Sequence, residues 1–401
     1  MNTSKHYAIV TETFPPEING VALTVRNLAR GLARRGHRVS LVRPRQDHET
    51  LRPYGQRADL RDEPGLQDTL VRGLALPRYP GLKFGLPAAG TLRQQWRVDR
   101  PAALYVATEG PLGLSAVSTA LQLGIPVATG LHTRFDEYMR DYGLGALAGL
   151  AFAWMRWFHN RAGATLVPTA ELRDALAQRG FRRPVHLARA VDPVRFSPRW
   201  RDRALRANWG LTDTDLAVIY VGRLAAEKNL GLAIRAFRAL QQRRPDARFI
   251  WIGDGPQRTA LERANPDFLF CGLQQGEALP RHIASGDLFL FPSRSETFGN
   301  VTLEAMASGV PTVAFNYGAA REHLRSGLHG ACVDDDTGFI DAAIALATDD
   351  ATRQHQSQAA SAAMQRLHPD QVAAAFDALL GGLSAPTARE EEVSCNRYPV
   401  K

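Results

Sequence analysis

Short apolar runs alternate along the chain with segments in which apolar residues recur every three or four positions. Residues 217–221 and 288–291 are apolar throughout, as expected of strands that a sheet buries on both faces. Residues 21–35 place their apolar side chains along one side of a helix. Further strands are predicted at residues 7–10, 39–42, 103–107, 126–129, 164–168, 248–252, 268–271 and 310–315. Further helices are predicted at residues 111–123, 170–179, 229–243, 300–308, 338–348, 351–366 and 370–382.

Strands that alternate with helices in this way predict an α/β protein built on parallel sheets. The alternation stops at residues 191–198, which contain two prolines and no periodicity, and it starts again at residue 217. We therefore predict a first domain over residues 1–195 and a second over residues 196–368, each a Rossmann-like unit. Residues 384–401 are expected to be a disordered tail.

Three segments do not fit the alternation. Residues 46–69 are polar, with mixed charge, and are predicted to be irregular. Residues 78–87 combine aromatic, basic, proline and glycine residues, including Lys83, which suits a membrane-facing loop or an ordinary surface loop. Residues 144–155 carry no charge and are too few to span a bilayer, so we expect a buried helix, with an interfacial helix as the alternative.

The composition is that of a soluble globular protein, with 45% hydrophobic and 22% charged residues. No apolar run is long enough for a membrane span, the N-terminus lacks a signal sequence, and the three cysteines have no metal or disulfide spacing. A cytoplasmic location is the expectation. The net charge of +9 is uneven, with +12 in residues 1–200 and −3 in residues 201–401. We expect the basic half to face an anionic membrane rather than nucleic acid, with solubility alone as the alternative.

Chemistry-bearing residues cluster in the stretch from Pro292 to Phe315, which reads as a loop, a helix and a strand after the strand at 288–291. Glu296 lies in the loop and Glu304 on the second turn of the helix, so the two carboxylates do not share a helix face. A glycine-containing loop at a helix start presents unpaired N–H groups and the positive end of the helix dipole. A carboxylate one turn into such a helix can reach ribose hydroxyls, and one in the loop can reach a sugar.

Two cations follow the strand at 217–221. Arg223 and Lys228 lie five positions apart, where a fork-shaped guanidinium and a point charge could hold a diphosphate; a solvated loop is the alternative. In the first domain, Gly20 allows a ligand to approach the backbone closely, and no Gly-x-Gly-x-x-Gly is present to indicate a dinucleotide cofactor. His132 follows the carboxyl end of a predicted strand, where open α/β sheets bind ligands.

Taken together, these stretches resemble the retaining glycosyltransferases of the GT-B fold that carry a Glu-x7-Glu signature, a large GT4-like family. The family includes phosphatidylinositol mannosyltransferases, sucrose synthases and sulfoquinovosyltransferases. The resemblance covers roughly residues 6–382. It rests on Glu296 and Glu304, on the Gly-Arg-Leu-x-x-x-Lys-Asn run from Gly222, and on Pro-Pro-x-x-Asn-Gly-Val around Gly20. The His-Thr-x-Phe-x-x-Tyr run from His132 is similar to that of the lipid-directed branch.

The resemblance implies two Rossmann-like domains that face an interdomain cleft, with a C-terminal helix, residues 369–383, crossing back to the first domain. It implies catalytic roles for His132 and Glu296 towards the donor sugar. Donor-binding roles fall on Gly20, Arg223, Lys228, Phe298, Gly299, Asn300, Val301 and Glu304. Lys83, Arg134 and Tyr138 are expected on the acceptor side.

The implied reaction is retaining transfer of a hexose, such as mannose, from a GDP- or UDP-sugar to a membrane lipid or glycolipid, without a metal or cofactor. The enzyme is then expected to sit peripherally at the inner face of the cytoplasmic membrane. A soluble or polysaccharide-precursor acceptor is the first alternative. A nucleotide-sugar epimerase or a phosphorylase on the same fold is the second, and a basic membrane or nucleic-acid adaptor without activity is the third.

Overall fold

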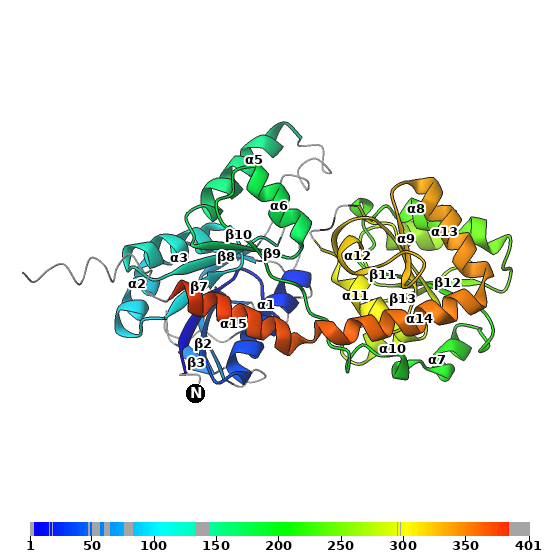
Figure 1. The fold of residues 1–401 in the computed structure, drawn as a ribbon, viewed down its shortest axis with the longest axis horizontal. Helices are drawn as coiled ribbons and strands as arrows, with labels where there is room; N and C mark the ends of the chain where they lie inside the picture. The colour runs from blue at the N-terminus through cyan, green and yellow to red at the C-terminus, as the bar shows by residue number, and fades with distance from the viewer. Residues whose placement is uncertain are drawn as a thin grey trace, which may run out of the picture. The chain divides into compact units, whose positions relative to one another are not determined.

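The computed structural model describes residues 4–15, 17, 19–46, 49, 57–59, 65–75, 83–132, 145–294, 296 and 298–384 (Figure 1). The chain divides into two compact units. Unit 1 comprises Met1–Thr133, Gly149–Ala188 and Asp370–Lys401, and unit 2 comprises Arg134–Ala148 and Arg189–Pro369.

Unit 1 is built on an eight-stranded sheet in the order β10-β9-β8-β7-β1-β2-β4-β3. Every neighbouring pair is parallel except β3 and β4. The strands are β1 (His6–Val10), β2 (Arg38–Pro44), β3 (Arg57–Asp59), β4 (Leu66–Val71), β7 (Ala103–Val106), β8 (Val127–Gly130), β9 (Ala164–Val167) and β10 (Pro184–His186). A separate antiparallel pair is formed by β5 (Gly73–Ala75) and β6 (Lys83–Gly85).

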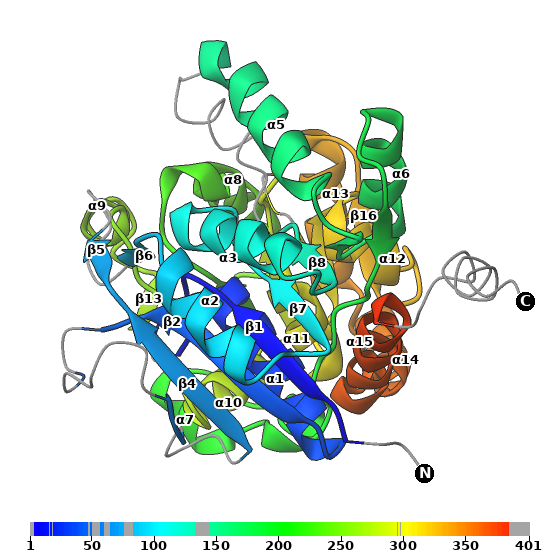
Figure 2. The same cartoon turned by 90° about the vertical axis from the view of Figure 1, so that its left-hand side faces the viewer.

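Helices cover both faces of this sheet because its strands are apolar on both sides. On one face α2 (Ala89–Val98) and α3 (Pro111–Gln122) pack against β1 and β7 (Figure 2). On the other face lie α1 (Gly20–Arg34) and α15 (Pro369–Leu383), whose Phe376 and Leu380 are buried in the same cluster as Leu32. The edge at β9 and β10 carries α5 (Gly145–His159) and α6 (Ala170–Gln178).

The last helix, α15, therefore belongs to unit 1. It lies so close to α1 that a Cβ on Gly31 would be 2.4 Å from the Cβ of Ala373. The buried carboxylate of Asp377 accepts hydrogen bonds from Tyr7 Oη and Arg35 Nε, each at 3.0 Å, and lies 3.0 Å from His37 Nε2. These contacts fix the helix to β1 and to the end of α1.

Unit 2 has a six-stranded, fully parallel sheet in the order β13-β12-β11-β14-β15-β16. Its strands are β11 (Ala217–Val221), β12 (Arg248–Ile252), β13 (Leu269–Gly272), β14 (Leu288–Phe291), β15 (Thr312–Phe315) and β16 (Gly330–Val333). Its helices are α7 (Arg203–Asn208), α8 (Leu230–Gln241), α9 (Arg258–Ala264), α10 (Ala278–Ala284), α11 (Asn300–Ala307), α12 (Gly318–His323), α13 (Asp336–Thr348) and α14 (Asp350–Met364). The short 3-10 helices are η1 (Pro198–Trp200), η2 (Ala226–Lys228) and η3 (Gln365–Leu367).

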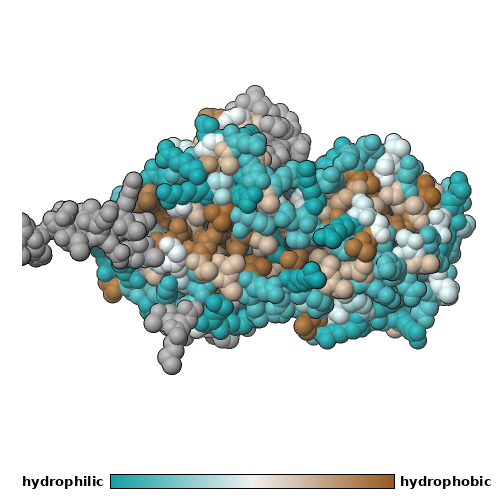
Figure 3. Space-filling model, in the orientation of Figure 1, coloured by the Kyte–Doolittle hydropathy of each residue, from teal (hydrophilic) through white to brown (hydrophobic). Residues whose placement is uncertain are grey.

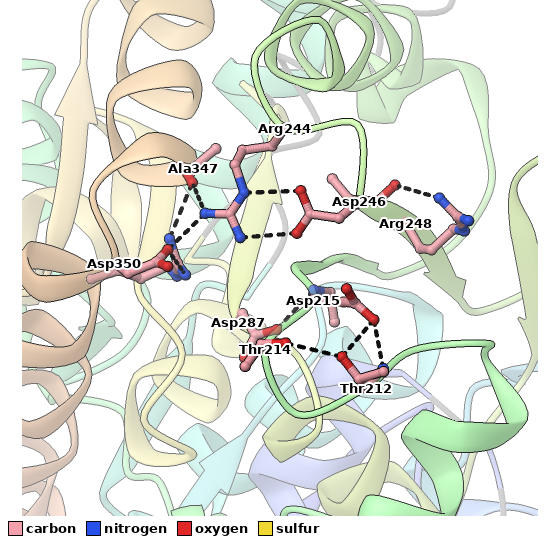
Figure 4. Close-up of polar contacts among 12 residues, drawn as sticks. Thr212, Thr214, Asp215, Arg244, Asp246, Arg248, Asp287, Ala347 and Asp350 are labelled. Carbon is pink, nitrogen blue, oxygen red and sulfur yellow. Dashed lines mark hydrogen bonds and ion pairs between the residues drawn. The ribbon is translucent and has the colours of Figure 1, made fainter.

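Charged residues at the amino edge of this second sheet are paired with one another, and they hold its segments together (Figure 4). Arg244, before β12, contacts Asp246 at 3.0 Å and Asp350 at 2.7 Å. Arg206 is 1% exposed and reaches Asp287, before β14, at 2.9 Å. Because these charges satisfy each other, we assign this edge a structural role.

The structure confirms the two parallel-sheet units and most of the predicted elements. The prediction that residues 46–69 are irregular is wrong in part, because β3 lies within this segment and β4 begins at Leu66 and pairs with β2. The expectation of a buried helix at residues 144–155 is also wrong in part: Leu150 and Trp154 on α5 are 70% and 42% exposed. The predicted tail lies outside the described residues, apart from Ser384.

The face of the protein drawn in Figure 3 is largely hydrophilic, with apolar side chains in separate patches. Within the part of the chain that the structure describes, no helix combines the length and the apolarity that crossing a membrane requires.

Candidate active site

The strand order of unit 2 reverses between β11 and β14. From β11 the chain passes through α8 to β12 on one side, and from β14 it passes through α11 to β15 on the other. Residues of α8 and α11 lie in separate core clusters, one on each face of the sheet. The loops that leave β11 and β14 therefore diverge, and such a switch point at the carboxyl edge is where α/β sheets bind ligands.

Two predicted site residues meet at this point. Lys228, in the loop after β11, places its Nζ 2.5 Å from Oε1 of Glu296, in the loop after β14. Ser293 donates a further hydrogen bond of 3.2 Å to the same oxygen. The two charged side chains are 19% and 22% exposed, so both remain open to solvent on one side.

The loop that carries the cations is shaped by a close contact with the next loop along the sheet. Gly222 N–H donates to Ile252 O at 3.0 Å, and Leu224 N–H donates to Asp254 O at 2.9 Å. Gly253 has φ +146°, and a Cβ there would lie 1.9 Å from Gly222 O, so only glycine fits. This packing holds the segment that leads to Lys228 at the carboxyl edge.

Arg223 lies at the start of the same loop with 47% of its side chain exposed. Its guanidinium is 3.8 Å from Glu227, and its carbonyl accepts a hydrogen bond from the buried Tyr220 hydroxyl at 3.1 Å. The Arg223 backbone is therefore anchored, while its guanidinium reaches solvent. Burial, with Glu296 and Glu227 nearby, raises the pKa of Tyr220 well above its ordinary value, so Tyr220 keeps its proton.

The start of α11 supplies the backbone part of the predicted site. Gly299 has φ +86° and caps the helix without a side chain, and the first helical hydrogen bond joins Thr302 N–H to Gly299 O at 3.0 Å. Asn300 and Val301 precede that bond, so their N–H groups belong to the open end of the helix. The side chain of Phe298, however, is buried in the core, so it contributes only its backbone at this edge.

Glu304 lies on the second turn of α11 and is half-buried. No hydrogen bond or ion pair joins its carboxylate to another described residue. Burial raises its pKa to about 7, against the opposing effect of Arg195. Its oxygens are therefore available to accept hydrogen bonds, because none of the described residues donates one to them.

Unit 1 has a switch point of its own between β1 and β7, and Gly20 lies beside it at the start of α1. The preceding loop is held by side chains: Thr13 Oγ1 donates to Glu17 at 2.5 Å, and Asn19 Nδ2 donates to Thr13 Oγ1 at 2.7 Å. Asn19 also caps α1 by accepting from Ala22 N–H at 2.8 Å. The backbone around Gly20 is thereby fixed.

His132 follows β8 at the same edge of unit 1. Its Nε2 lies 2.7 Å from the hydroxyl of Tyr105, which is almost fully buried on β7. Gly130 makes room for this pair, since a Cβ there would lie 2.1 Å from the Tyr105 hydroxyl and 2.6 Å from His132 Nε2. Tyr105 therefore orients the imidazole, and nothing in its sequence context distinguished it from a core residue.

Two carboxylates near this edge, one partly buried and one buried, were also missed by the sequence analysis. Glu12, after β1, accepts from Leu112 N–H at 3.2 Å, and burial raises its pKa to about 7. Glu109, after β7, lies 3.2 Å from His159 Nε2. These residues hold loops together through partners that are 100 and 50 positions away, a separation that sequence periodicity does not detect.

The remaining predicted residues are less informative. The loop predicted at residues 78–87 is wrong at Lys83, which lies on β6 and whose Nζ donates to Arg45 O at 3.4 Å. Arg134 and Tyr138 lie outside the described residues. Among the described residues no group of three or more His, Cys, Asp or Glu could hold a metal ion. Asp335, in the acidic run 334–336, caps α13 by accepting from Gly338 N–H at 2.7 Å.

Comparison with known proteins identifies the class to which this fold and site belong. Residues 18–195 match the family model described as Glycosyltransferase Family 4, and residues 215–349 match that of Glycosyl transferases group 1. Among solved structures, a sucrose-phosphate synthase from Thermosynechococcus elongatus superposes with a TM-score of 0.74 over 94% of this chain and 99% of its own, at 17% identity. WaaG, a lipopolysaccharide-biosynthesis glycosyltransferase, superposes with a TM-score of 0.69 over 94% of this chain and 100% of its own, at 14% identity. The fold is therefore GT-B.

The relatives in sequence are more specific. A GDP-mannose-dependent alpha-mannosyltransferase of Mycolicibacterium smegmatis is 34% identical over 83% of this chain and 85% of its own length. The sulfoquinovosyl transferase SQD2 of Arabidopsis thaliana is 30% identical over 67% of this chain and 52% of its own length. The chain belongs to glycosyltransferase family 4 and is a hexosyltransferase.

Proposed function

We propose that this enzyme transfers mannose from GDP-mannose to a membrane lipid or glycolipid, with retention of the anomeric configuration and without a metal ion. The observation that carries the proposal is the contact of Lys228 with Glu296 at the switch point beside the start of α11. The donor class is supported by the alpha-mannosyltransferase of Mycolicibacterium smegmatis, whose name specifies GDP-mannose. The lipid acceptor is supported by a relative named alpha-monoglucosyldiacylglycerol synthase, 23% identical over 76% of this chain and 70% of its own length.

In the proposed reaction the bond between the anomeric carbon and the diphosphate oxygen breaks, and a bond from an acceptor hydroxyl forms on the same face of the sugar. Negative charge grows on the leaving diphosphate, which takes up the hydroxyl proton. Preorganised positive charge at the leaving diphosphate oxygen is usually the largest single contribution of a protein to stabilising such a transition state. We assign this task to Lys228, to Arg223 and to the N–H groups of Asn300 and Val301.

The geometry of the pair also places the two halves of the donor. Because Glu296 lies 2.5 Å from Lys228, a phosphate held by the lysine would lie next to a sugar held by the glutamate. The scissile bond then spans the two residues. We assign the ribose hydroxyls to Glu304, whose carboxylate has no partner among the described residues. The role of His132 towards the sugar stays a prediction, as does that of Gly20 towards the diphosphate.

The location at the inner face of the cytoplasmic membrane is part of the same proposal. It is supported by the charge of +12 in residues 1–200 and by the lipid acceptor.

The test is transfer of radiolabelled sugar from GDP-mannose, and separately from UDP-hexoses, to membrane lipids by the purified enzyme. We expect label from GDP-mannose in the lipid fraction. Lys228→Ala should lower kcat/KM by about 10²–10³, because it removes a charge that acts mainly in the transition state. Arg235→Ala is the control. It removes an exposed cation of α8 that pairs with Asp336 and lies outside the loop with Arg223 and Lys228.

The outcomes separate the parts of the proposal. Label in a water-soluble product but in no lipid would show a soluble acceptor. Release of an altered nucleotide sugar without any acceptor would show an epimerase, and a requirement for inorganic phosphate would show a phosphorylase. Equal rates for wild type and Lys228→Ala would remove the assigned role of the lysine.

A further inference from the structure

Helix α5 has two different sides. Met155 and Phe158 are buried against the body of unit 1, and Phe152 packs on Phe181 with ring centroids 5.7 Å apart. The opposite side exposes Leu150, Trp154 and Trp157 by 70%, 42% and 46%. These three positions follow the spacing i, i+4 and i+7, so they form one apolar stripe.

The stripe is bordered by arginines on two segments. Arg156 and Arg161 are exposed on and just after α5, and Arg182 is exposed in the loop after α6. Together with Ala153, Trp157 and Asn160, these arginines line a surface hollow of about 350 Å³. Arg161 lies over the Trp157 ring with 4.9 Å between its Cζ and the ring centroid.

The two segments that carry the stripe and its arginines are basic. Residues 149–163 and 179–183 contain five arginines and no aspartate or glutamate. The helix itself extends away from the sheet of unit 1 in Figures 1 and 2. The indole rings of Trp154 and Trp157 stack with centroids 5.1 Å apart, which presents a flat apolar surface between cationic groups.

We propose that this surface, defined by Leu150, Trp154, Trp157, Arg156, Arg161 and Arg182, docks the enzyme on an anionic phospholipid bilayer. Tryptophan favours the depth of the headgroups, where its ring is apolar and its N–H remains hydrated. The arginines at its border attract lipid phosphates, and their stems cover apolar surface. A helix with an apolar stripe and a basic margin lies in the plane of the interface.

A protein partner fits the observations less well. Exposed tryptophans occur in protein interfaces too, but such interfaces are depleted in charge at their centre. Here Arg156 lies between the two tryptophans in sequence, and the hollow beside Trp157 is lined by three arginines. Arginines beside a small apolar stripe match a surface of anionic groups. This inference rests on the lipid acceptor that we propose, because it names the face through which the enzyme would reach that acceptor.

The test is flotation of the full-length enzyme with phosphatidylcholine vesicles that contain or lack phosphatidylglycerol, followed by its tryptophan emission. We expect binding only to the anionic vesicles, with a blue shift of emission from Trp154 and Trp157. The triple variant Arg156→Gln/Arg161→Gln/Arg182→Gln should bind about a hundredfold more weakly, at ~1 kcal/mol for each arginine. Trp154→Ser/Trp157→Ser should abolish the blue shift and weaken binding.

Two matched variants control for charge and for apolarity. Arg97→Gln/Arg203→Gln/Arg366→Gln removes three exposed arginines elsewhere, and Val98→Ser/Leu273→Ser removes two exposed apolar side chains elsewhere. Both should bind like wild type. The inference is overturned if wild type does not float, if the control triple loses as much binding as the surface triple, or if the tryptophan pair leaves flotation unchanged. It is also overturned if light scattering shows a dimer that Trp154→Ser/Trp157→Ser dissociates.

A second assay distinguishes failure of this surface from failure of the proposed function. The surface variants should retain transfer to a short-chain lipid acceptor dispersed in detergent, where docking is not required. Flotation with no transfer to any lipid would remove the proposed acceptor and leave the surface. Transfer to bilayer lipid that is equal in wild type and surface variants would remove the surface and leave the acceptor.

Discussion

Glu304 shows how burial can shift the protonation of a carboxylate that has no hydrogen-bonding partner among the described residues. Its pKa is raised to about 7 by burial, and none of the described residues hydrogen-bonds to it. Lys228 and Glu296 represent the opposite case, because each has its charge satisfied by the other at 2.5 Å. A donor that binds between them must replace that contact with interactions of its own.

We expect donor affinity to depend on the protonation of Glu304. As pH falls through about 7, the carboxylate gains a proton and can no longer accept from two ribose hydroxyls, so GDP-mannose should bind more weakly. Glu304→Gln should bind about tenfold to a hundredfold more weakly at pH 8 and should lose this pH dependence. Calorimetric titration between pH 5.5 and 8.5 (roughly the range over which such a group changes charge) measures both effects.

The stability of the same variant provides the control. The folded state binds the Glu304 proton more tightly than the unfolded chain, whose pKa is 4.5, so the free energy of unfolding falls as pH rises from 4.5 to about 7. Glu304→Gln removes that loss and should be at least as stable as wild type at pH 8. Glu277→Gln, on an exposed residue, should change neither property. Equal donor affinity in wild type and Glu304→Gln at pH 8 would contradict the assignment.

At the scale of elements, the site depends on how two loops pack. The loop with Arg223 and Lys228 keeps its path because Gly222 lies against Gly253. The same scale explains α15, whose apolar side packs on unit 1 and whose Asp377 meets Tyr7, Arg35 and His37.

Gly253→Ala should displace the loop with Arg223 and Lys228. Its Cβ would meet a backbone oxygen at 1.9 Å, which no side-chain movement relieves. We expect donor affinity to fall at least about tenfold, together with a lower melting temperature. Gly36→Ala is the matched control, because Gly36 has φ +87° but nothing within 4 Å. Gly36→Ala should lower the free energy of unfolding by about 1–2 kcal/mol through backbone strain, and donor affinity should be unchanged. Thermal shift with GDP measures both quantities.

Asp377→Asn should loosen α15 from unit 1. Burial alone would raise the pKa of Asp377, but its interactions with His37, Arg35 and Tyr7 hold that pKa below 3.8. The carboxylate therefore stabilises the fold above pH 3.8, and this stabilisation is lost as pH falls through the lower folded value. The variant should lose about 3–5 kcal/mol at pH 7, measured by urea unfolding.

The comparison variant lies on the same helix. Asp370 is exposed and 3.8 Å from the exposed Arg34, so Asp370→Asn should cost less than about 1 kcal/mol. Similar losses in the two variants would mean that the buried contacts of Asp377 do not hold the helix.

The bounds of most strands and helices were predictable from the sequence, whereas one strand and the contact of Lys228 with Glu296 were not. Strands β11, β12 and β14 match their predicted bounds because both faces of each are apolar. Strand β4 escaped notice because Asp68, inside it, is fully buried and paired with Arg43 on β2, so the apolar run is interrupted. The contact of Lys228 with Glu296 required the strand order, because nothing local brings together residues 68 positions apart.

For the whole molecule, positive charge is the recurring property. It is concentrated in residues 1–200, and in unit 2 it includes Arg223 and Lys228, to which we assign the leaving diphosphate in the proposed reaction. In the proposed reaction, side chains and helix N–H groups would stabilise the negative charge on the leaving diphosphate, as a divalent cation does in other transferases.

Removal of divalent ions should therefore leave the reaction intact. We expect the same initial rate of mannose transfer in EDTA as in magnesium or manganese, after dialysis against chelator. The control is an authentic metal-dependent transferase assayed in the same buffers, which must lose its activity. A rate that falls in EDTA and returns with one added metal would contradict the metal-independent mechanism.

The position of α15 also bears on how the protein is made. The core of unit 1 is completed by Phe376 and Leu380, which are translated only after the whole of unit 2. During synthesis on the ribosome, unit 1 cannot complete its fold and keeps an apolar face exposed until α15 is made, whereas unit 2 can fold before that. A stalled or truncated nascent chain that ends before residue 370 should therefore require chaperone protection, even though its unit 2 is complete.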